Sequence, residues 1–542
     1  MKTFLKTIAW IIGIPVGIVL IFAFLGFMAI NYNFWPPNCN ILPLKQAQRV
    51  CEFSKIEKVS NNLPTKTTFW VTIPYNTPKS DKIFLSIDGK NPVEMEKINE
   101  VSFQTAIDTK TGETLIYKYL RNSENSISDI KNISIKSLDK KIYDGVSGWN
   151  DLAMPVKFPK ELMPGVIMID TWTMNYHFNL FEDTRKNVDS SMARAKKLNS
   201  QSFGVFSFID VDGDKNSFVL REPKFSLKHV RDNAITEAEM KKITAAAKKY
   251  GTETVIHYNI GPDFSKYISP SMNPFAVRGR GGDAANKRAA NDMGFFEPKS
   301  KEWVDMWFSG LSPILVKWAK SAEAAGIDAI DITPQYTVPS FAPEEKYADE
   351  KYKEIIAAMR LVYKGKIYGS NFHNFGGITQ NPITKTPDLT YINELDGLYL
   401  YIPDIAAHKG ASIGEIKTAY GDYISQFEKE FVNYPKDIFI GIGVPSYEGF
   451  INGKPRVEYG DFSEVMEKGY KENWQEQADA YEAIFQALNG KTFFKGIATS
   501  GYDYDDLMAP KYADPLNNMA PTIRNKPAEA VWKKWILASP IN

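Results

Sequence analysis

The sequence predicts an α/β protein whose larger part, residues 160–542, is a (β/α)8 barrel, or TIM barrel. Eight short apolar segments that end in polar residues begin at Gly165, as buried parallel strands do. Amphipathic segments separate most of them, and strands that alternate with helices indicate βαβ units. Before Gly165 the apolar residues instead alternate with polar ones, which indicates a separate, smaller β domain.

The residues after the first strand argue against the main alternative, an open doubly wound sheet. Such a sheet usually carries a glycine-rich phosphate loop there, and Asp170-Thr171-Trp172-Thr173 contains no glycine. The expected strands are Gly165–Asp170, Phe203–Asp210, Glu253–Tyr258, Ala329–Ile332, Lys366–Asn371, Gly397–Tyr401, Ile438–Ile442 and Phe494–Thr499. The expected helices are Asp189–Lys197, Thr236–Tyr250, Lys301–Ala325, Glu350–Tyr363, Ile413–Phe431 and Glu472–Leu488.

A small β-sandwich is expected over residues 63–158. The turn pairs Asp88-Gly89 and Thr111-Gly112 punctuate this region. Short alternating strands with turn residues between them are typical of such a fold. The strands are expected at Thr67–Ile73, Lys82–Ile87, Val101–Ile107 and Thr114–Tyr119.

The N-terminal segment indicates the compartment. Lys2 and Lys6 precede a run from Ile8 to Ile30 that carries no charge, and this run is long enough to cross a hydrocarbon core of about 30 Å. Lysines tend to stay on the cytoplasmic side, so the bulk of the chain is expected to be extracytoplasmic, in the periplasm or at the cell surface. Residues 1–31 are therefore expected to be an uncleaved signal anchor, a single transmembrane helix, followed by a linker over 32–62. A cleaved signal peptide is the alternative.

Cys39 and Cys51 are the two cysteines of the chain. In an oxidising compartment they are expected to form a disulfide that closes a small loop behind the anchor.

Charge and histidine content argue against two classes of function. The 65 basic and 64 acidic side chains are interspersed, so nothing favours nucleic acid as a partner. The five histidines form no His-x-x-x-His or His-Glu-x-x-His pair, which argues against a zinc hydrolase. No cofactor is expected. The aromatic content of 13% favours a glycan binder, because flat rings stack on sugar faces.

Polar and aromatic side chains stand at or after the expected carboxyl ends of the strands, where the active sites of such barrels lie. Carboxylates, amides and imidazoles pair with sugar hydroxyls, and aromatic rings cover the apolar sugar faces. We therefore expect an oligosaccharide or polysaccharide to bind there. The candidate binding residues are Trp172, Asp210, His257, Asn259, Gln335, Tyr336, Asn371, Tyr399, Tyr401 and Asp503.

Cleavage of a glycosidic bond needs two carboxylates, one that protonates the leaving oxygen and one that attacks or activates water. Asp331, at the end of the fourth strand, and Glu448, after the seventh, are the candidate catalytic pair. The alternatives are a structural Asp331 that ties a barrel loop and a solvated Glu448.

Asp210, Asp212 and Asp214 alternate around Gly213, a spacing that can wrap calcium. The glutamate that would close a twelve-residue calcium loop is absent. An ordinary acidic turn is therefore favoured, and no metal site is assigned.

Several segments of the larger part resemble glycoside hydrolase family 113 and its relatives. They are Lys301–Phe308, Ala319–Ile330, Asp437–Ser446, Gln475–Ala483 and Asn525–Glu529. This resemblance implies a clan A barrel that binds sugar. Val71–Leu85 and Glu113–Tyr119 are similar to family 20 starch-binding modules and their relatives, which implies that the β domain binds carbohydrate as well.

The resemblance also implies a retaining mechanism, with a glutamate acid/base after the fourth strand and a glutamate nucleophile on the seventh. This chain has Thr333-Pro334-Gln335 at the first place and Gly441 at the second, and neither Pro334 nor Gly441 can attack or transfer a proton. We therefore expect a membrane-anchored, glycoside-hydrolase-like protein that acts on or binds polysaccharide. A catalytically inactive glycan-binding barrel and an envelope scaffold for a protein partner are the alternatives.

Overall fold

A computed structural model of the chain describes most of the two folded parts. The described residues are 61–122, 126–136, 138–168, 184–222, 235–262, 294–295, 297–333, 339–371, 390–402, 408, 410–452, 469–500, 519 and 521–539. The expected anchor over 1–31, almost all of the linker, and the pair Cys39 and Cys51 lie outside these ranges. Across the ranges given, no helix is long and apolar enough to cross a membrane.

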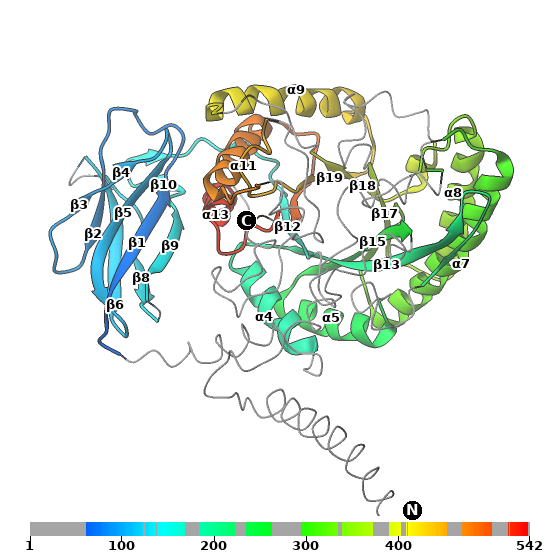
Figure 1. Cartoon of the computed structure of the whole chain (residues 1–542), viewed down its shortest axis with the longest axis horizontal. Coiled ribbons are helices and arrows are strands. Elements are labelled where there is room, and N and C mark those ends of the chain that lie inside the picture. The colour runs from blue at the N-terminus through cyan, green and yellow to red at the C-terminus, as the bar shows by residue number, and fades with distance from the viewer. Residues whose placement is uncertain are drawn as a thin grey trace, which may run out of the picture.

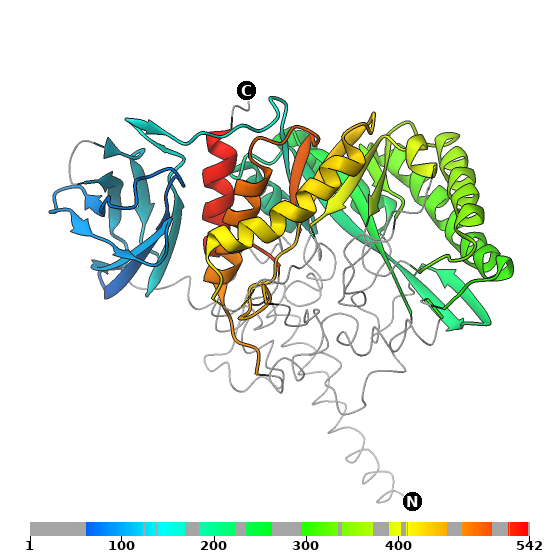
Figure 2. The ribbon, with the colours of Figure 1, turned by 90° about the horizontal axis from the view of Figure 1, so that it is seen from above.

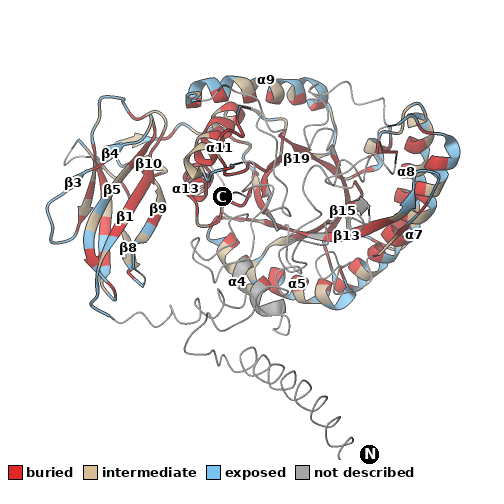
Figure 3. Ribbon diagram, viewed as in Figure 1, coloured by how far each residue is buried: buried red, intermediate tan, exposed pale blue. Residues whose placement is uncertain are grey.

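Eight parallel strands close into a barrel, which confirms the fold class expected for the larger part (Figure 1). Closure follows from the pairing of the first strand with both the second and the last. The strands are largely buried, because one face lines the barrel interior and the other lies under helices (Figure 3). In spatial order they are β12 (Met163–Met168), β13 (Ser202–Asp214), β15 (Glu253–Pro262), β16 (Ala329–Asp331), β17 (Lys366–Asn371), β18 (Gly397–Tyr401), β19 (Asp437–Ile442) and β20 (Gly496–Ser500).

Helices surround the barrel, and six of the described α-helices overlap the helices expected from the sequence. The last α-helix and a 3-10 helix were not expected. The α-helices are α4 (Thr184–Lys196), α5 (Glu237–Tyr250), α7 (Lys301–Ala325), α8 (Glu345–Arg360), α9 (Ile413–Phe431), α11 (Trp474–Leu488) and α13 (Pro527–Ala538), with the 3-10 helix η3 (Tyr391–Glu394). Thr236 and Glu239 form a capping box that begins α5, as the sequence predicts. Gly326, with a φ of 74°, ends α7 in the left-handed conformation that glycine adopts without strain.

The second barrel strand is longer than expected, since the sequence predicts that it ends at Asp210. Instead β13 continues to Asp214 and pairs with antiparallel β14 (Ser217–Arg221) in a hairpin. Phe218 of β14 is buried against Trp303 of α7, with ring centroids 5.0 Å apart. Apolar contact with α7 thus stabilises the strand beyond the barrel wall.

The smaller β domain contains all four strands expected from the alternation, namely β1 (Pro64–Thr72), β2 (Ile83–Ile87), β5 (Ser102–Lys110) and β6 (Thr114–Arg121). The further strands are β3 (Val93–Glu94), β4 (Glu96–Lys97), β7 (Ser126–Ile127), β8 (Lys131–Ser134) and β9 (Lys140–Gly145), with a short hairpin of β10 (Gly148–Trp149) and β11 (Leu152–Ala153). One sheet has the order β4-β5-β1-β9, and the other has β3-β2-β6-β7 with β8 also on β6. Phe69 of β1 and Tyr117 of β6 meet edge to face at 5.0 Å, so the two sheets contact through buried rings. The carbohydrate-binding character expected of this domain stays a prediction.

The β domain docks on α11 and α13, which stand between it and the barrel (Figure 2). Lys534 of α13 is fully buried and forms an ion pair of 2.7 Å with Glu482 of α11. The same ammonium donates to Thr72 Oγ1 at 3.0 Å and to the Ile73 carbonyl at 2.8 Å. One buried cation therefore connects both helices to the first strand of the β domain.

Close packing reinforces this docking. The rings of Tyr75 and Trp535 are stacked, with centroids 5.3 Å apart and planes inclined by 6°. A Cβ atom at Gly145 would lie 2.4 Å from the Ala530 carbonyl oxygen, so only glycine allows this approach of β9 to α13. The two parts are therefore in intimate contact rather than joined by a linker alone.

Candidate functional site

Four neighbouring strands bring polar and aromatic side chains together inside the barrel. The strand register places His257 of β15 beside Asp331 of β16, since Ile256 pairs with Ile330. Ser370 of β17 lies opposite Tyr399 of β18. These four side chains are 0–5% exposed, and we call them the interior cluster.

Asp331 is the centre of the interior cluster. Its Oδ2 accepts hydrogen bonds from His257 Nδ1, at 3.1 Å, and from the Ser370 hydroxyl. Its Oδ1 accepts from the backbone N–H of Thr333 at 3.0 Å. A buried carboxylate is costly unless such donors surround it, and here three strands and the loop after β16 contribute to one group.

The hydrogen bond to Asp331 orients the imidazole of His257. A carboxylate only accepts, so Nδ1–H is the donor and the second ring nitrogen, Nε2, points away from Asp331. Tyr399 contacts the same ring edge to face, with centroids 5.0 Å apart. Burial raises the pKa of the Tyr399 hydroxyl well above its usual range, so this phenol stays a hydrogen-bond donor.

Tyr401 fills the place where the family 113 resemblance implies a nucleophile. Tyr401 is the last residue of β18 and pairs in register with Gly441 of β19. A Cβ atom at Gly441 would lie 2.4 Å from Cδ1 of the Tyr401 ring. The ring therefore packs directly on the glycine, and the described barrel has no room there for a glutamate.

Tyr399 and Tyr401 were expected to stack on a sugar, but their rings are 2% and 4% exposed. Phe439 stacks on Tyr399 with centroids 4.9 Å apart. Both tyrosines thus fill the barrel interior in this structure and support the residues above them. Their predicted role as a stacking surface stays a prediction.

Several predicted binding residues cannot be placed. Trp172, Gln335, Tyr336 and Asp503 lie outside the described residues, as do the side chains of Asn259 and Asn371. The binding roles of these residues stay predictions.

Glu448, the second candidate carboxylate, lies in a turn after β19 and is half-buried. Its backbone N–H donates to the Lys471 carbonyl at 2.8 Å. The neighbouring carboxylate is Glu476 of α11, which accepts from the backbone N–H of Gly449 at 3.0 Å. The pairing of Glu448 with Asp331 in catalysis stays a prediction.

The three aspartates weighed as calcium ligands belong to the β13–β14 hairpin. Asp210 is buried in β13, and Asp212 forms an ion pair of 3.0 Å with Arg221 of β14. Asp214 accepts from the backbone N–H of Asn216 and of Ser217, at 2.9 and 3.2 Å, and so closes the turn. Within the described ranges, no three His, Cys, Asp or Glu side chains form a group that could hold a metal ion.

Sequence reasoning missed Ser370 as a member of the interior cluster. A serine inside an apolar strand gives little signal in one sequence. The strand register supplies the missing information, because Asp331 pairs with Tyr368 and Ser370 is the next residue on the same face.

The interior cluster can hold an imidazole in one tautomer and orientation beneath the mouth of the barrel. A histidine fixed in this way can donate or accept one hydrogen bond at Nε2, which suits a hydroxyl-rich ligand or a proton transfer. The aromatic neighbours exclude water from this layer and strengthen its hydrogen bonds.

No family model and no curated protein matches the sequence. Among solved structures, a glycoside hydrolase family 113 β-1,4-mannanase matches at 17% identity over 70% of this chain and 99% of its own, with a TM-score of 0.47. The family 113 β-mannanase AaManA from Alicyclobacillus acidocaldarius matches at 14% identity over 71% and 98%, with a TM-score of 0.43. A family 5 mannosidase from Rhizomucor miehei matches at 12% identity over 72% and 96%, with a TM-score of 0.42. The barrel fold itself follows from the order and closure of the chain's own strands.

Proposed function

We propose that this chain is a glycoside-hydrolase-like protein that engages polysaccharide at the mouth of its barrel, outside the cytoplasm. The uncharged run from Ile8 to Ile30 supports an anchor in the membrane. The barrel supports a ligand site at the carboxyl ends of its strands, because active sites of this fold lie there.

The observation that carries the proposal is the interior cluster of His257, Asp331, Ser370 and Tyr399. It lies in strands β15–β18, toward the carboxyl ends of the barrel. Purely structural barrel layers are filled by branched apolar side chains. A buried carboxylate with three donors in such a layer therefore supports a functional floor beneath a polar ligand.

A second candidate function, glycan binding without hydrolysis, is favoured by Tyr401 and Gly441. The ring of Tyr401 occupies the space of any side chain at position 441. A retaining mechanism with a nucleophile on β19 therefore has no residue to carry it at this position. Hydrolysis would have to use Asp331 with a partner such as Glu448.

The test uses the full-length chain in detergent with a panel of plant, bacterial and fungal polysaccharides. Release of reducing ends reports hydrolysis, and retardation in gels that contain each polymer reports binding. For an active enzyme, Asp331→Asn should lower turnover by orders of magnitude, because the change removes a carboxylate whose role is in the transition state. Retardation without reducing ends would instead establish the binding function.

The matched comparison is Trp172→Ala, which removes the one mouth tryptophan expected from the sequence, against Asp108→Ala, an exposed acid on β5. Loss of retardation in the first variant alone is the expected result. A wild-type chain that neither cleaves nor binds any polymer of the panel would refute the proposal.

A further inference from the structure

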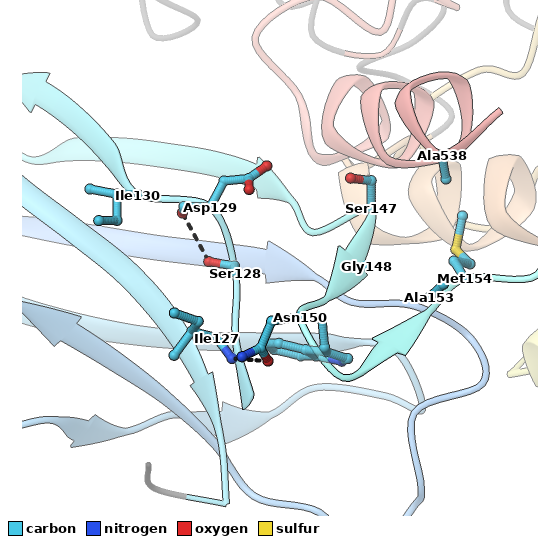
Figure 4. A pocket seen from close by; sticks show the side chains of 11 residues that line it. Ile127, Ser128, Asp129, Ile130, Ser147, Gly148, Asn150, Ala153, Met154 and Ala538 are labelled. Atoms are coloured by element: carbon cyan, nitrogen blue, oxygen red, sulfur yellow. Dashed lines mark hydrogen bonds between the residues drawn. The ribbon is translucent and has the colours of Figure 1, made fainter. Parts of the chain in front are cut away.

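A groove lies where the β domain meets the end of α13 (Figure 4). Its volume of about 570 Å³ falls within the range of about 300–1,000 Å³ that is usual for ligand-binding clefts. Three segments line it, namely Ile127–Ile130 between β7 and β8, residues 147–154 around the β10–β11 hairpin, and Ala538 of α13. Ala538 is the one residue from the barrel part among the described lining residues, so the groove lies at the edge of the contact between the two parts.

Two polar side chains face each other across the groove. The Asp129 carboxylate and the Ser147 hydroxyl point into the gap from opposite walls (Figure 4). Neither side chain has a hydrogen-bond or ion-pair partner within the part of the chain that the structure describes. A ligand can thus use both groups without breaking an existing contact.

The walls of the groove are held in place by buried or paired groups. Trp149 is 4% exposed, and its indole N–H donates to Thr77 Oγ1 at 3.0 Å. Asn150 Oδ1 accepts from the backbone N–H of Ile127 at 3.0 Å, which ties the hairpin to the facing segment. Ser128 is fixed as well, because its hydroxyl accepts from the Tyr119 N–H at 2.9 Å. A site with fixed walls costs little ordering when a ligand binds.

The chemistry of the lining suits a neutral sugar. Apolar atoms of the lining residues give the groove an apolar surface beside these two polar groups. A carboxylate and a hydroxyl beside such surface match the hydroxyls and the C–H faces of a pyranose. Asp129 is the one charged side chain among the described lining residues, so an anionic sugar would meet repulsion with no compensating cation.

The groove lies at the opposite end of the barrel from the interior cluster. Phe158, which precedes β12, contacts Trp535 of α13 at 5.9 Å and Phe494, which precedes β20, at 6.2 Å. The end of α13 thus packs beside the amino ends of the barrel strands, whereas Asp331 ends β16. A polymer that occupies the mouth cannot reach the groove along a short path.

We infer that the groove between residues 127–130, the β10–β11 hairpin and α13 is a second glycan-binding site, which holds a neutral segment of polysaccharide away from the barrel mouth. The inference rests on the proposed function for the class of ligand, and on the groove alone for the place. Such a site raises the local concentration of polymer at the mouth by attaching the same chain twice.

The experiment is affinity electrophoresis of the full-length chain in detergent, with carob galactomannan, barley β-glucan, soluble amylose or polygalacturonate in the gel. The double variant Asp129→Ala with Ser147→Ala should lose at least tenfold in affinity for the neutral polymer that retards the wild type. Polygalacturonate should retard neither protein. Asp108→Ala, an exposed acid of the same domain outside the groove, is the matched control and should behave as the wild type.

Three results would overturn the inference: unchanged retardation of the double variant, an equal loss in Asp108→Ala, or stronger retardation by polygalacturonate than by neutral polymers. Trp172→Ala separates this inference from the proposed function. Loss of binding in Trp172→Ala with normal binding in the groove variant refutes the groove site and leaves the barrel proposal standing. Loss of binding in the groove variant with normal binding in Trp172→Ala supports the groove site and counts against a binding site at the barrel mouth.

Discussion

Glu482 and Asp331 are both buried carboxylates, but they are compensated in different ways. Glu482 meets a full positive charge, the Lys534 ammonium at 2.7 Å, and also accepts from the Trp535 indole N–H at 2.9 Å. Asp331 meets an imidazole, a hydroxyl and a backbone N–H. The first arrangement joins helices to the β domain, and the second orients a side chain that can exchange a proton.

The partners of the two carboxylates indicate different roles. Burial lowers the pKa of Lys534, and the Glu482 carboxylate that faces it opposes that shift. Removing one member leaves an uncompensated charge in the interior. Each carboxylate has three donors, since Glu482 also accepts from the Gln486 side-chain amide at 3.0 Å. None of the three around Asp331 is a lysine or arginine, and losing one of them leaves two in place.

The largest expected effect follows from Lys534→Met. The change leaves Glu482 buried without its cation, so the free energy of unfolding should fall by about 3–5 kcal/mol. Chemical denaturation of the full-length chain measures this loss. The double variant Lys534→Met with Glu482→Gln should recover most of it, because no charge then remains unpaired.

The control for this prediction is Lys241→Met on α5. Lys241 forms an exposed ion pair of 2.6 Å with Glu237, and exposed pairs of this kind contribute less than about 1 kcal/mol. Equal losses in the two lysine variants would show that the interface pair has no special role.

A smaller effect is expected for Asp331→Asn. An amide oxygen can replace one acceptor but not both, so a donor in the interior cluster is left unsatisfied, at a cost of about 1–3 kcal/mol. Thermal unfolding followed by circular dichroism measures it. Ser370→Ala should cost less, since it removes a donor and leaves the carboxylate two others. A larger loss in Ser370→Ala than in Asp331→Asn would contradict this account of the cluster.

A third effect, expressed per pH unit, concerns Asp479, which lies on α11 at the interface. Its carboxylate accepts from Asn99 Nδ2 of the β domain at 2.7 Å and from Gln475 Nε2 at 2.8 Å. The pKa of Asp479 is raised to about 7, chiefly by burial. The nearby carboxylates Glu482 and Glu476 also raise this pKa, and the two amides that donate to Asp479 lower it.

Because this pKa lies above the unfolded value of about 3.9, the folded chain binds the proton more tightly. The contribution of Asp479 to stability is therefore complete below the unfolded pKa and is lost as the pH rises through about 7. Asp479→Asn, which mimics the protonated form, should remove a slope of at most about 1.4 kcal/mol per pH unit. Unfolding curves at pH 5 to 8 compare the variant with the wild type, and identical slopes would contradict the prediction.

The barrel could be predicted from the sequence because its strands and helices carry strong local signals. The apolar runs Gly397–Tyr401 and Lys366–Asn371 form strands with the expected bounds. The helix Ile413–Phe431 also has its expected bounds. Capping residues such as Ser412 and Glu415 mark helix starts by a local hydrogen-bond pattern that needs no tertiary information.

Long-range contacts could not be predicted in the same way. Lys534 reads as an exposed lysine on an amphipathic helix, and only the docking of the β domain buries it. The hairpin that extends β13 depends on Trp303, about ninety residues further along the chain. Three members of the interior cluster were named from the sequence, because His257, Asp331 and Tyr399 stand at recognisable strand positions. Ser370 joins them only through strand register.

The packing of Tyr401 on Gly441 restricts the order in which substitutions can accumulate. Any side chain at position 441 would have its Cβ 2.4 Å from the tyrosine ring. A glutamate there becomes tolerable only after Tyr401 has been replaced by a small residue. Replacing Tyr401 first removes a buried ring and leaves a cavity, at a cost of about 3–5 kcal/mol. Each single step from the present pair is therefore unfavourable, and a lineage that has acquired both residues is held there by epistasis, whatever its chemistry.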